Sequence, residues 1–210
     1  MKKEEIKYLA IIFFSILFLW RCTTIKIDDL KLCQEFYELN KNNSLNNLSK
    51  LSIEVRNMEF SSDINKYQIK FYFVGIYDTV KRGYIKIPVL ELNYAPEKRI
   101  DALKRCDEDC KSLLKQEYNF INEQDLPKIL EGFTHKVKVD FNNIQLPKQY
   151  PYTNVLEVQG EPFYGIIIFK LTDNAFVYYV SNINKFDIKY LPNTAIKLDE
   201  YWYYNIEKKR

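Results

Sequence analysis

Alternation of apolar and polar positions begins near Ile53 and continues through much of the chain. The clearest stretch places Tyr67, Ile69, Phe71 and Phe73 at odd positions, with polar residues between most of them. Side chains spaced by two residues point to one face of a β-strand. We therefore predict a strand here, with these four residues facing the core.

Further segments with the pattern of strands follow. They cover residues 84–94, 137–141, 156–159, 163–171, 176–180, 186–190 and 196–204. Pro88 cannot donate a ladder hydrogen bond, so the first of these segments is expected at a sheet edge or a bulge. Segment 163–171 is apolar on both faces, which is typical of a central strand covered on both sides. The polar turn 172–174 joins it to segment 176–180 as a hairpin.

Apolar residues at helical spacing mark other parts of the chain. Residues 28–39 begin with paired acids, which suit the positive end of a helix, and predict a short amphipathic helix. Pro96 and Glu97 open the longest predicted helix, since proline suits the first helical position. The apolar arc of that helix comprises Ile100, Leu103, Cys106, Cys110, Leu113, Leu114 and Tyr118. A second short helix is predicted over residues 124–131.

The order of these elements indicates the fold class. Strands precede and follow a helical block, which favours α+β with a mainly antiparallel sheet of about 6–9 strands. One long amphipathic helix and one or two short helices are expected to pack on the sheet, preceded by an N-terminal hydrophobic helix. We divide the chain into an export signal or membrane anchor over 1–21, a tether with a short helix and an Asn-rich loop over 22–47, and a single globular domain over 48–210.

The N-terminal segment combines a positively charged start with an apolar run. Residues 8–20 contain Ser15 as their only polar side chain, and three lysines precede them. This order is typical of an export signal. As a helix the run would reach about 20 Å, which is less than the roughly 30 Å hydrocarbon core that a spanning helix must cross.

Leu19, Trp20, Arg21 and Cys22 end this segment. They resemble the lipobox of bacterial prolipoproteins, in which leucine stands three positions before the modified cysteine. The resemblance implies that Cys22 is diacylated and becomes the new N-terminus. Arg21 stands where such boxes normally have a small residue, so an uncleaved anchor is the alternative. We expect the protein at the cell membrane or outer membrane, lipid-anchored and facing outside the cytoplasm.

Charge argues against one class of partner. The 31 basic residues only slightly exceed the 28 acidic ones, and part of that excess lies in the N-terminal segment. A nucleic-acid binder usually shows a strong basic excess that neutralises phosphates. Nucleic acid is therefore not an expected partner.

Export places the cysteines in an oxidising compartment, where disulfides persist. If Cys22 is acylated, Cys33, Cys106 and Cys110 remain. A bridge between Cys106 and Cys110 fits poorly within one helical turn, and becomes plausible only if residues 106–110 form a turn between two helices. We therefore expect a disulfide between Cys33 and either Cys106 or Cys110. Buried free thiols are the alternative.

Catalytic motifs are absent from the sequence. The single histidine, His135, excludes sites that need two imidazoles, and no phosphate-binding glycine loop, nucleophile elbow or dinucleotide fingerprint occurs. A metal site that combines the 106–110 segment with His135 lacks a second paired-ligand motif. We therefore assign no catalytic residue, no metal and no cofactor.

Consecutive aromatic residues near the C-terminus offer a binding surface. Alternate members of a strand face opposite sides, so some of them are free to form an exposed stacking platform for a sugar ring, a peptide or a partner protein. This predicted platform comprises Tyr178, Tyr179, Tyr201, Trp202, Tyr203 and Tyr204. The sequence thus favours a membrane-anchored, extracytoplasmic binding module for an envelope protein or a glycan. An envelope hydrolase that uses acidic residues and a purely structural envelope protein are the alternatives.

Overall fold

The computed structural model describes residues 28–55, 57–61, 66–70, 73–91, 95–119, 122–147 and 156–207. The predicted N-terminal hydrophobic helix and the lipobox with Cys22 lie outside these ranges. Within them, no helix has both the length and the apolar character needed to cross a membrane.

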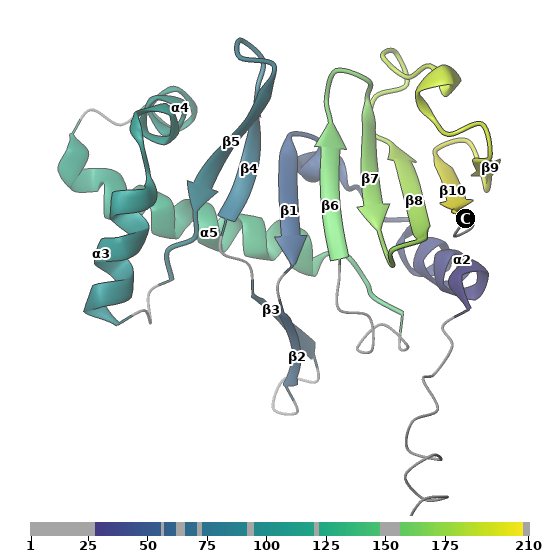
Figure 1. Ribbon diagram of the computed structural model, residues 1–210, viewed down its shortest axis with the longest axis horizontal. Coiled ribbons are helices and arrows are strands. Elements are labelled where there is room, and N and C mark those ends of the chain that lie inside the picture. The colour runs from purple at the N-terminus through teal and green to yellow at the C-terminus, as the bar shows by residue number, and fades with distance from the viewer. Residues whose placement is uncertain are drawn as a thin grey trace, which may run out of the picture.

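An eight-stranded antiparallel sheet forms the centre of the molecule, in the order β5-β4-β1-β6-β7-β8-β10-β9 (Figure 1). Its strands are β1 Leu51–Val55, β4 Phe73–Asp78, β5 Gly83–Pro88, β6 Leu156–Glu161, β7 Ile166–Lys170, β8 Ala175–Val180, β9 Ile196–Lys197 and β10 Trp202–Ile206. Strands β2 Asn57–Ser61 and β3 Lys66–Lys70 form a separate two-stranded sheet. The predicted α+β class with an antiparallel sheet is confirmed.

Four α-helices accompany the sheet in the described part of the chain. They are α2 Asp29–Asn40, α3 Pro96–Arg105, α4 Glu108–Tyr118 and α5 Leu126–Asn142, with short 3₁₀ turns η1 Asn46–Leu48, η2 Glu123–Asp125 and η4 Ile188–Tyr190. Figure 1 shows α3 and α4 at the β5 edge and α2 near β8, at the other end of the sheet. The predicted helix over 28–39 is therefore confirmed as α2, capped by Asp28, whose carboxylate accepts hydrogen bonds from the next turn.

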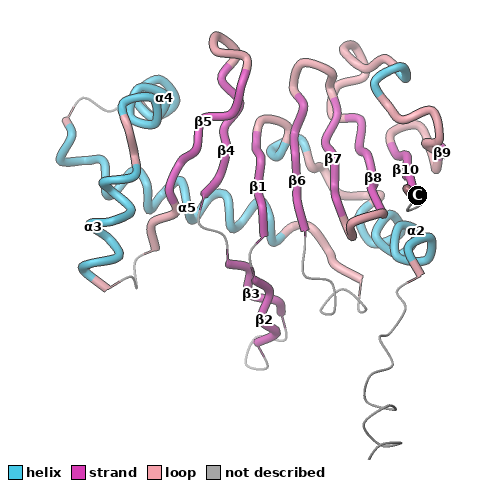
Figure 2. The backbone as a smooth tube through the Cα atoms, in the orientation of Figure 1, coloured by secondary structure: helices cyan, strands magenta, loops and turns pink. Residues whose placement is uncertain are grey.

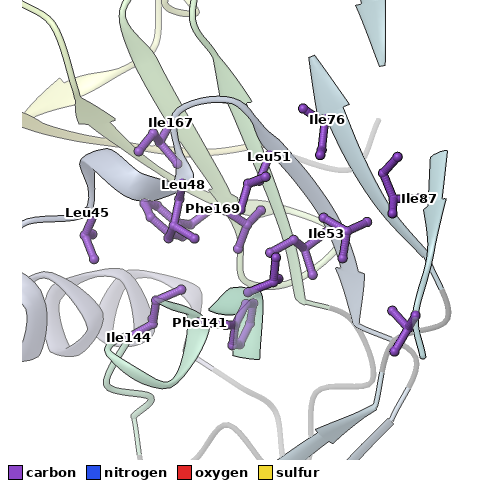
Figure 3. Packing of buried hydrophobic residues seen from close by; sticks show 14 of the residues in the cluster. Leu45, Leu48, Leu51, Ile53, Ile76, Ile87, Phe141, Ile144, Ile167 and Phe169 are labelled. Atoms are coloured by element: carbon purple, nitrogen blue, oxygen red, sulfur yellow. The ribbon is translucent and has the colours of Figure 1, made fainter. Parts of the chain in front are cut away.

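The main core lies between these helices and one face of the sheet. Sheet residues such as Ile53 and Phe169 pack with Phe141 of α5 and with Leu45 and Leu48 before β1 (Figure 3). Helix α2, which the sequence placed in a tether, contributes three fully buried residues to the same core: Leu32, Cys33 and Phe36. The ring of Phe36 lies 5.1 Å from that of Phe169. Helix α2 is thus part of the folded core.

The hairpin predicted across turn 172–174 is confirmed. Strands β7 and β8 pair antiparallel, and the Thr172 hydroxyl accepts hydrogen bonds from the backbone of Asn174 and Ala175. Ile167 faces the main core, whereas its neighbour Ile166 belongs to a second buried cluster on the opposite face. Strand β7 is therefore buried on both sides, as its continuous apolar sequence predicts.

Strand β5 also agrees with its sequence. It lies at one edge of the sheet and ends at Pro88, as the missing proline N–H requires. The alternating stretch 67–73 is instead divided, because Tyr67 and Ile69 belong to β3 of the small sheet and Phe73 begins β4. Phe71 lies outside the described residues.

The strand predicted over 137–141 is wrong, because this segment is the second half of α5, a 17-residue helix. Val137 and Phe141 are both buried, and their spacing of four fits a helix as well as a strand. Val139 is 48% exposed, although alternation would bury it with its neighbours. Leu130, Phe133 and Thr134 complete one buried stripe, so helical periodicity prevails over the β-branched composition.

The long helix predicted from Pro96 is divided in two. Helix α3 ends at Arg105, Cys106 and Asp107 adopt extended conformations, and α4 begins at Glu108. The Asp107 carboxylate accepts a hydrogen bond from the N–H of Cys110, which caps α4. The strand predicted over 186–190 is wrong, because this segment lies in a loop whose residues Ile188–Tyr190 form the 3₁₀ turn η4.

Candidate interaction surface

The predicted disulfide from Cys33 is wrong. Cys106 and Cys110 are bridged to each other, with Cα atoms 5.2 Å apart, and Cys33 is a buried free thiol. The break between α3 and α4 permits this bridge, since residues 106–110 are a turn between two helices. Helix α2 packs on β8 and β10 whereas α4 packs on β5, so Cys33 lies near one end of an eight-stranded sheet and the disulfide near the other.

Cys33 is enclosed where α2 meets β8, and its thiol contacts the carbonyl oxygen of Phe176. Burial, together with the negative charge of Asp29, raises the pKa of this thiol to about 12. A neutral, buried thiol is a poor nucleophile and a poor metal ligand. Cys33 therefore has a packing role.

The predicted aromatic platform is largely inside the protein. Tyr178, Trp202, Tyr203 and Tyr204 are between 1% and 9% exposed. Trp202 packs against Phe36, Tyr37, Phe169 and Tyr179 under α2. Tyr178 and Tyr203 belong to the second cluster, on the opposite face of the sheet. Tyr201 alone among the six is classed as exposed, at 42%, so these residues do not form a contiguous surface.

Exposed aromatic side chains lie instead at the turn between β6 and β7 and in the loop between β8 and β9. We name this surface the aromatic corner and define it by Phe163, Tyr164, Ile183, Ile188 and Tyr190. Figure 2 shows the two loops at the same end of the sheet, away from α2 (Figure 2). The backbone N–H groups of residues 181 and 182 both donate to the carbonyl oxygen of Gly165, which joins the two loops directly.

Ring contacts connect the corner. The rings of Phe163 and Tyr164 lie 5.5 Å apart at nearly right angles, and those of Tyr164 and Tyr190 lie 4.0 Å apart. Phe163 is 61% exposed and Ile188 is 65% exposed. Exposed apolar residues that stand singly are normal in soluble proteins, whereas large contiguous apolar patches mark recognition surfaces.

The corner rests on a packed base. The second cluster comprises Ile166, Tyr178, Val180, Leu191 and Tyr203, with Tyr164 and Phe186 packed against it. Tyr164 thus has one side in this cluster and the other in contact with Tyr190. An aromatic side chain fixed from below loses little conformational entropy when a partner covers it.

Backbone geometry holds the turn in place. Gly165 has φ of +68°, and a Cβ there would collide with the carbonyl oxygen of Asn182. Glycine is the residue that adopts this conformation without strain. The Asn182 side chain accepts a hydrogen bond from the N–H of Asn184, and Asp187 does the same for Lys189. The two loops are therefore ordered by local hydrogen bonds as well as by packing.

Basic side chains border the corner. Lys189 lies 5.1 Å from the centre of the Tyr190 ring and forms an ion pair with Asp187. That ion pair and the backbone hydrogen bond from Lys189 lower the pKa of the Asp187 carboxyl. Lys185 donates to the carbonyl oxygen of Pro162. The rim is thus polar and charged around an apolar centre, which is the usual arrangement of a protein interface.

The sequence contains a pattern that could have predicted this surface, but the interpretation of residues 163–171 as one strand obscured it. Phe163 and Tyr164 stand between Pro162 and Gly165, and proline and glycine favour a turn, where side chains are usually polar. Two aromatic residues in a turn are therefore exposed unless another segment covers them. Assigning 163–171 to one strand placed them in the sheet.

The remaining candidate residues are His135, Cys106 and Cys110. His135 lies on the exposed side of α5. The disulfide engages both Cys106 and Cys110, and among the described residues no group of three metal-binding side chains is assembled.

Comparison with protein-family models, with curated proteins and with solved structures finds no match for this chain. The function is therefore inferred from the geometry of the chain itself.

Proposed function

We propose that the chain is a membrane-anchored, extracytoplasmic binding module that uses the aromatic corner to bind a partner protein of the cell envelope. The observation that carries this proposal is the connected set Phe163, Tyr164 and Tyr190, in which Phe163 and Tyr190 are exposed and Tyr164 is half-buried on a packed base. Tyrosine and phenylalanine are enriched at protein interfaces because they bury a large area with few rotatable bonds.

The position of the corner supports a protein partner over a lipid surface. The Thr172 hydroxyl and the Asp29 carboxylate are 2.9 Å apart, so α2 begins beside the β7–β8 turn. The corner lies at the opposite end of β7, a strand of five residues and thus about 17 Å long. The segment that carries the proposed anchor joins the domain at residue 28. An anchored domain would then present the corner away from the point of attachment.

The anchor is tested by metabolic labelling with an acyl chain. We expect the full chain to incorporate the label and the Cys22→Ser variant to lose it, because a thioether at Cys22 is the attachment that the lipobox resemblance implies. Retention in the membrane fraction without label would assign the attachment to an uncleaved hydrophobic segment. Equal labelling of both proteins would exclude lipidation at Cys22.

The corner is tested by affinity capture of envelope proteins with the full chain in detergent. Tyr190→Ser should reduce capture of a specific protein at least about tenfold, the effect of removing an anchor residue of an interface. Tyr201→Ser is the matched control, since Tyr190 and Tyr201 are 41% and 42% exposed. A partner that is lost with Tyr201→Ser and retained with Tyr190→Ser would assign binding to the predicted platform instead.

The alternative of an acid-dependent hydrolase has one specific observation in its favour. Glu117 and Asp140 line the same pocket. The pocket has a volume of about 110 Å³, whereas sites for molecules of the size of a drug or a disaccharide are roughly 300–1,000 Å³. The size of this pocket therefore favours a binding module over a glycan hydrolase.

A further inference from the structure

A small pocket lies where the C-terminal end of α4 and the middle of α5 meet the beginning of β1. Its lining residues come from η1 and the following turn, β1, β4, α4 and α5: Asn47, Lys50, Leu51, Ile76, Glu117, Tyr118, Phe133, Lys136, Val137 and Asp140. It is distant in sequence from the aromatic corner and shares no residue with it. Its chemistry therefore concerns a separate ligand.

Four apolar side chains form the inner surface of the pocket. Leu51, Ile76, Phe133 and Val137 are between 1% and 8% exposed and belong to the main core. Figure 3 shows Leu51 and Ile76 on neighbouring strands of this core. A ligand group in contact with them has to be apolar, because none of these side chains offers a hydrogen bond.

The rim of the pocket carries charges of both signs. Lys50 and Lys136 supply two positive charges, and Glu117 and Asp140 supply two negative ones. Within the described part of the chain, Lys50, Lys136 and Glu117 form no ion pair, and Asp140 accepts one hydrogen bond from the amide of Asn47. Charged groups that are left unpaired at the mouth of a pocket are available to a ligand.

Tyr118 indicates how the two carboxylates are arranged. Burial raises the pKa of its phenol, and the charges of Glu117 and Asp140 raise the pKa further. Both carboxylates therefore act on the same phenol, which stays protonated at neutral pH. Glu117 and Asp140 therefore both lie close enough to Tyr118 to act on it, and Lys50 and Lys136 line the same pocket.

We propose that this pocket binds a small zwitterion with an apolar side chain, of the class of a free aliphatic α-amino acid. The ammonium group of the ligand pairs with Glu117 and Asp140, its carboxylate pairs with Lys50 and Lys136, and its side chain contacts the apolar inner surface. The volume of about 110 Å³ accommodates a ligand of this size class. A ligand with only one charge leaves either the two lysines or the two carboxylates without a partner.

Titration of the full chain in detergent with L-valine, followed by calorimetry or NMR, tests this proposal. Isobutylamine and isovalerate, which each lack one of the two charges, should bind at least about tenfold more weakly than L-valine. Lys136→Ala and Glu117→Gln replace rim residues on the protein surface and should each weaken L-valine binding by a similar factor. Lys128→Ala, at another exposed position of α5, should leave binding unchanged.

Two results would overturn the proposal. One is the absence of L-valine binding at about 10 mM, a concentration that nearly saturates a site with a Kd of 1 mM. The other is binding of L-valine with equal affinity to the wild type, Lys136→Ala and Glu117→Gln. Circular dichroism of each variant confirms that the fold is retained, because both substituted side chains lie outside the core.

Discussion

At the scale of single residues, Gly160 shows how closely β6 approaches the chain before β1. A Cβ at this position would overlap the backbone of Leu48 and Ser49. We predict that Gly160→Ala lowers the free energy of unfolding by about 1–3 kcal/mol, because backbone cannot move aside as a flexible side chain can. Urea denaturation measures this change.

Gly132 is the matched control for that substitution. It lies on the exposed side of α5, and a Cβ there meets nothing within 4 Å. Gly132→Ala should raise the free energy of unfolding by about 0.5–1 kcal/mol, since alanine restricts the unfolded chain and suits a helix. Equal effects of the two substitutions would contradict the close approach of β6 to residues 48–49.

Two buried acidic groups predict how stability depends on alkaline pH. Burial raises the pKa of Cys33 from 9.0 to about 12, and that of Tyr178 from 10.0 to about 12. In both cases the unfolded chain loses its proton at lower pH than the native protein. Their contribution to stability is therefore complete below about pH 9 and is lost as the pH rises toward about 12.

Urea denaturation at about pH 8 and at about pH 11 measures this loss of stability. The free energy of unfolding should fall between these values, and Cys33→Ala should reduce the slope because one of the contributing groups is then missing. A midpoint that is independent of pH in the wild type would show that these groups are not enclosed as described.

At the scale of elements, the disulfide connects the end of α3 with the first turn of α4. In a Cys22→Ser chain denatured without reductant, we expect one thiol to react, at Cys33, and three after reduction. The label is located by peptide mass spectrometry. Label at Cys106 or Cys110 before reduction would contradict the bridge between these two residues.

The elements that the sequence predicted correctly depend on local signals. Helix α2 has an Asp28 cap and an apolar stripe, and the β7–β8 hairpin has a polar turn between apolar strands. The α+β class with a mainly antiparallel sheet also followed from the order of elements. In these cases local preference and tertiary packing agree.

The elements that the sequence predicted wrongly have apolar positions that are compatible with two different structures. Val137 and Phe141 fit a strand by alternation and a helix by their spacing of four, and burial of Phe133 and Leu130 decides for the helix. The arc from Ile100 to Tyr118 is continuous in helical spacing, but Asp107 caps a new helix and Cys106 adopts an extended conformation. Neither outcome follows from periodicity alone.

At the scale of the whole molecule, the candidate surface required tertiary structure. Tyr201, Trp202, Tyr203 and Tyr204 are consecutive in sequence, but three of them are buried because β10 lies between α2 and the second cluster. The corner joins residues 163–164 to residue 190, and these segments meet through the backbone contacts at Gly165 and the ring contact between Tyr164 and Tyr190. Most of the aromatic residues that the sequence assigned to an exposed platform are buried, and the exposed aromatic residues of the corner lie in other segments.

The central claim is that the aromatic corner binds a partner protein, and site-specific photocrosslinking in the full chain tests it most directly. A photoreactive phenylalanine analogue replaces Phe163 in one protein and Tyr201 in another, and native membranes are irradiated. Because Phe163 is 61% exposed in the corner and Tyr201 lies outside it, we predict a discrete protein adduct from position 163, absent from position 201 and lost when Tyr190→Ser is added. Adducts with lipid alone, no adduct at position 163, or equal adducts from both positions would contradict the account.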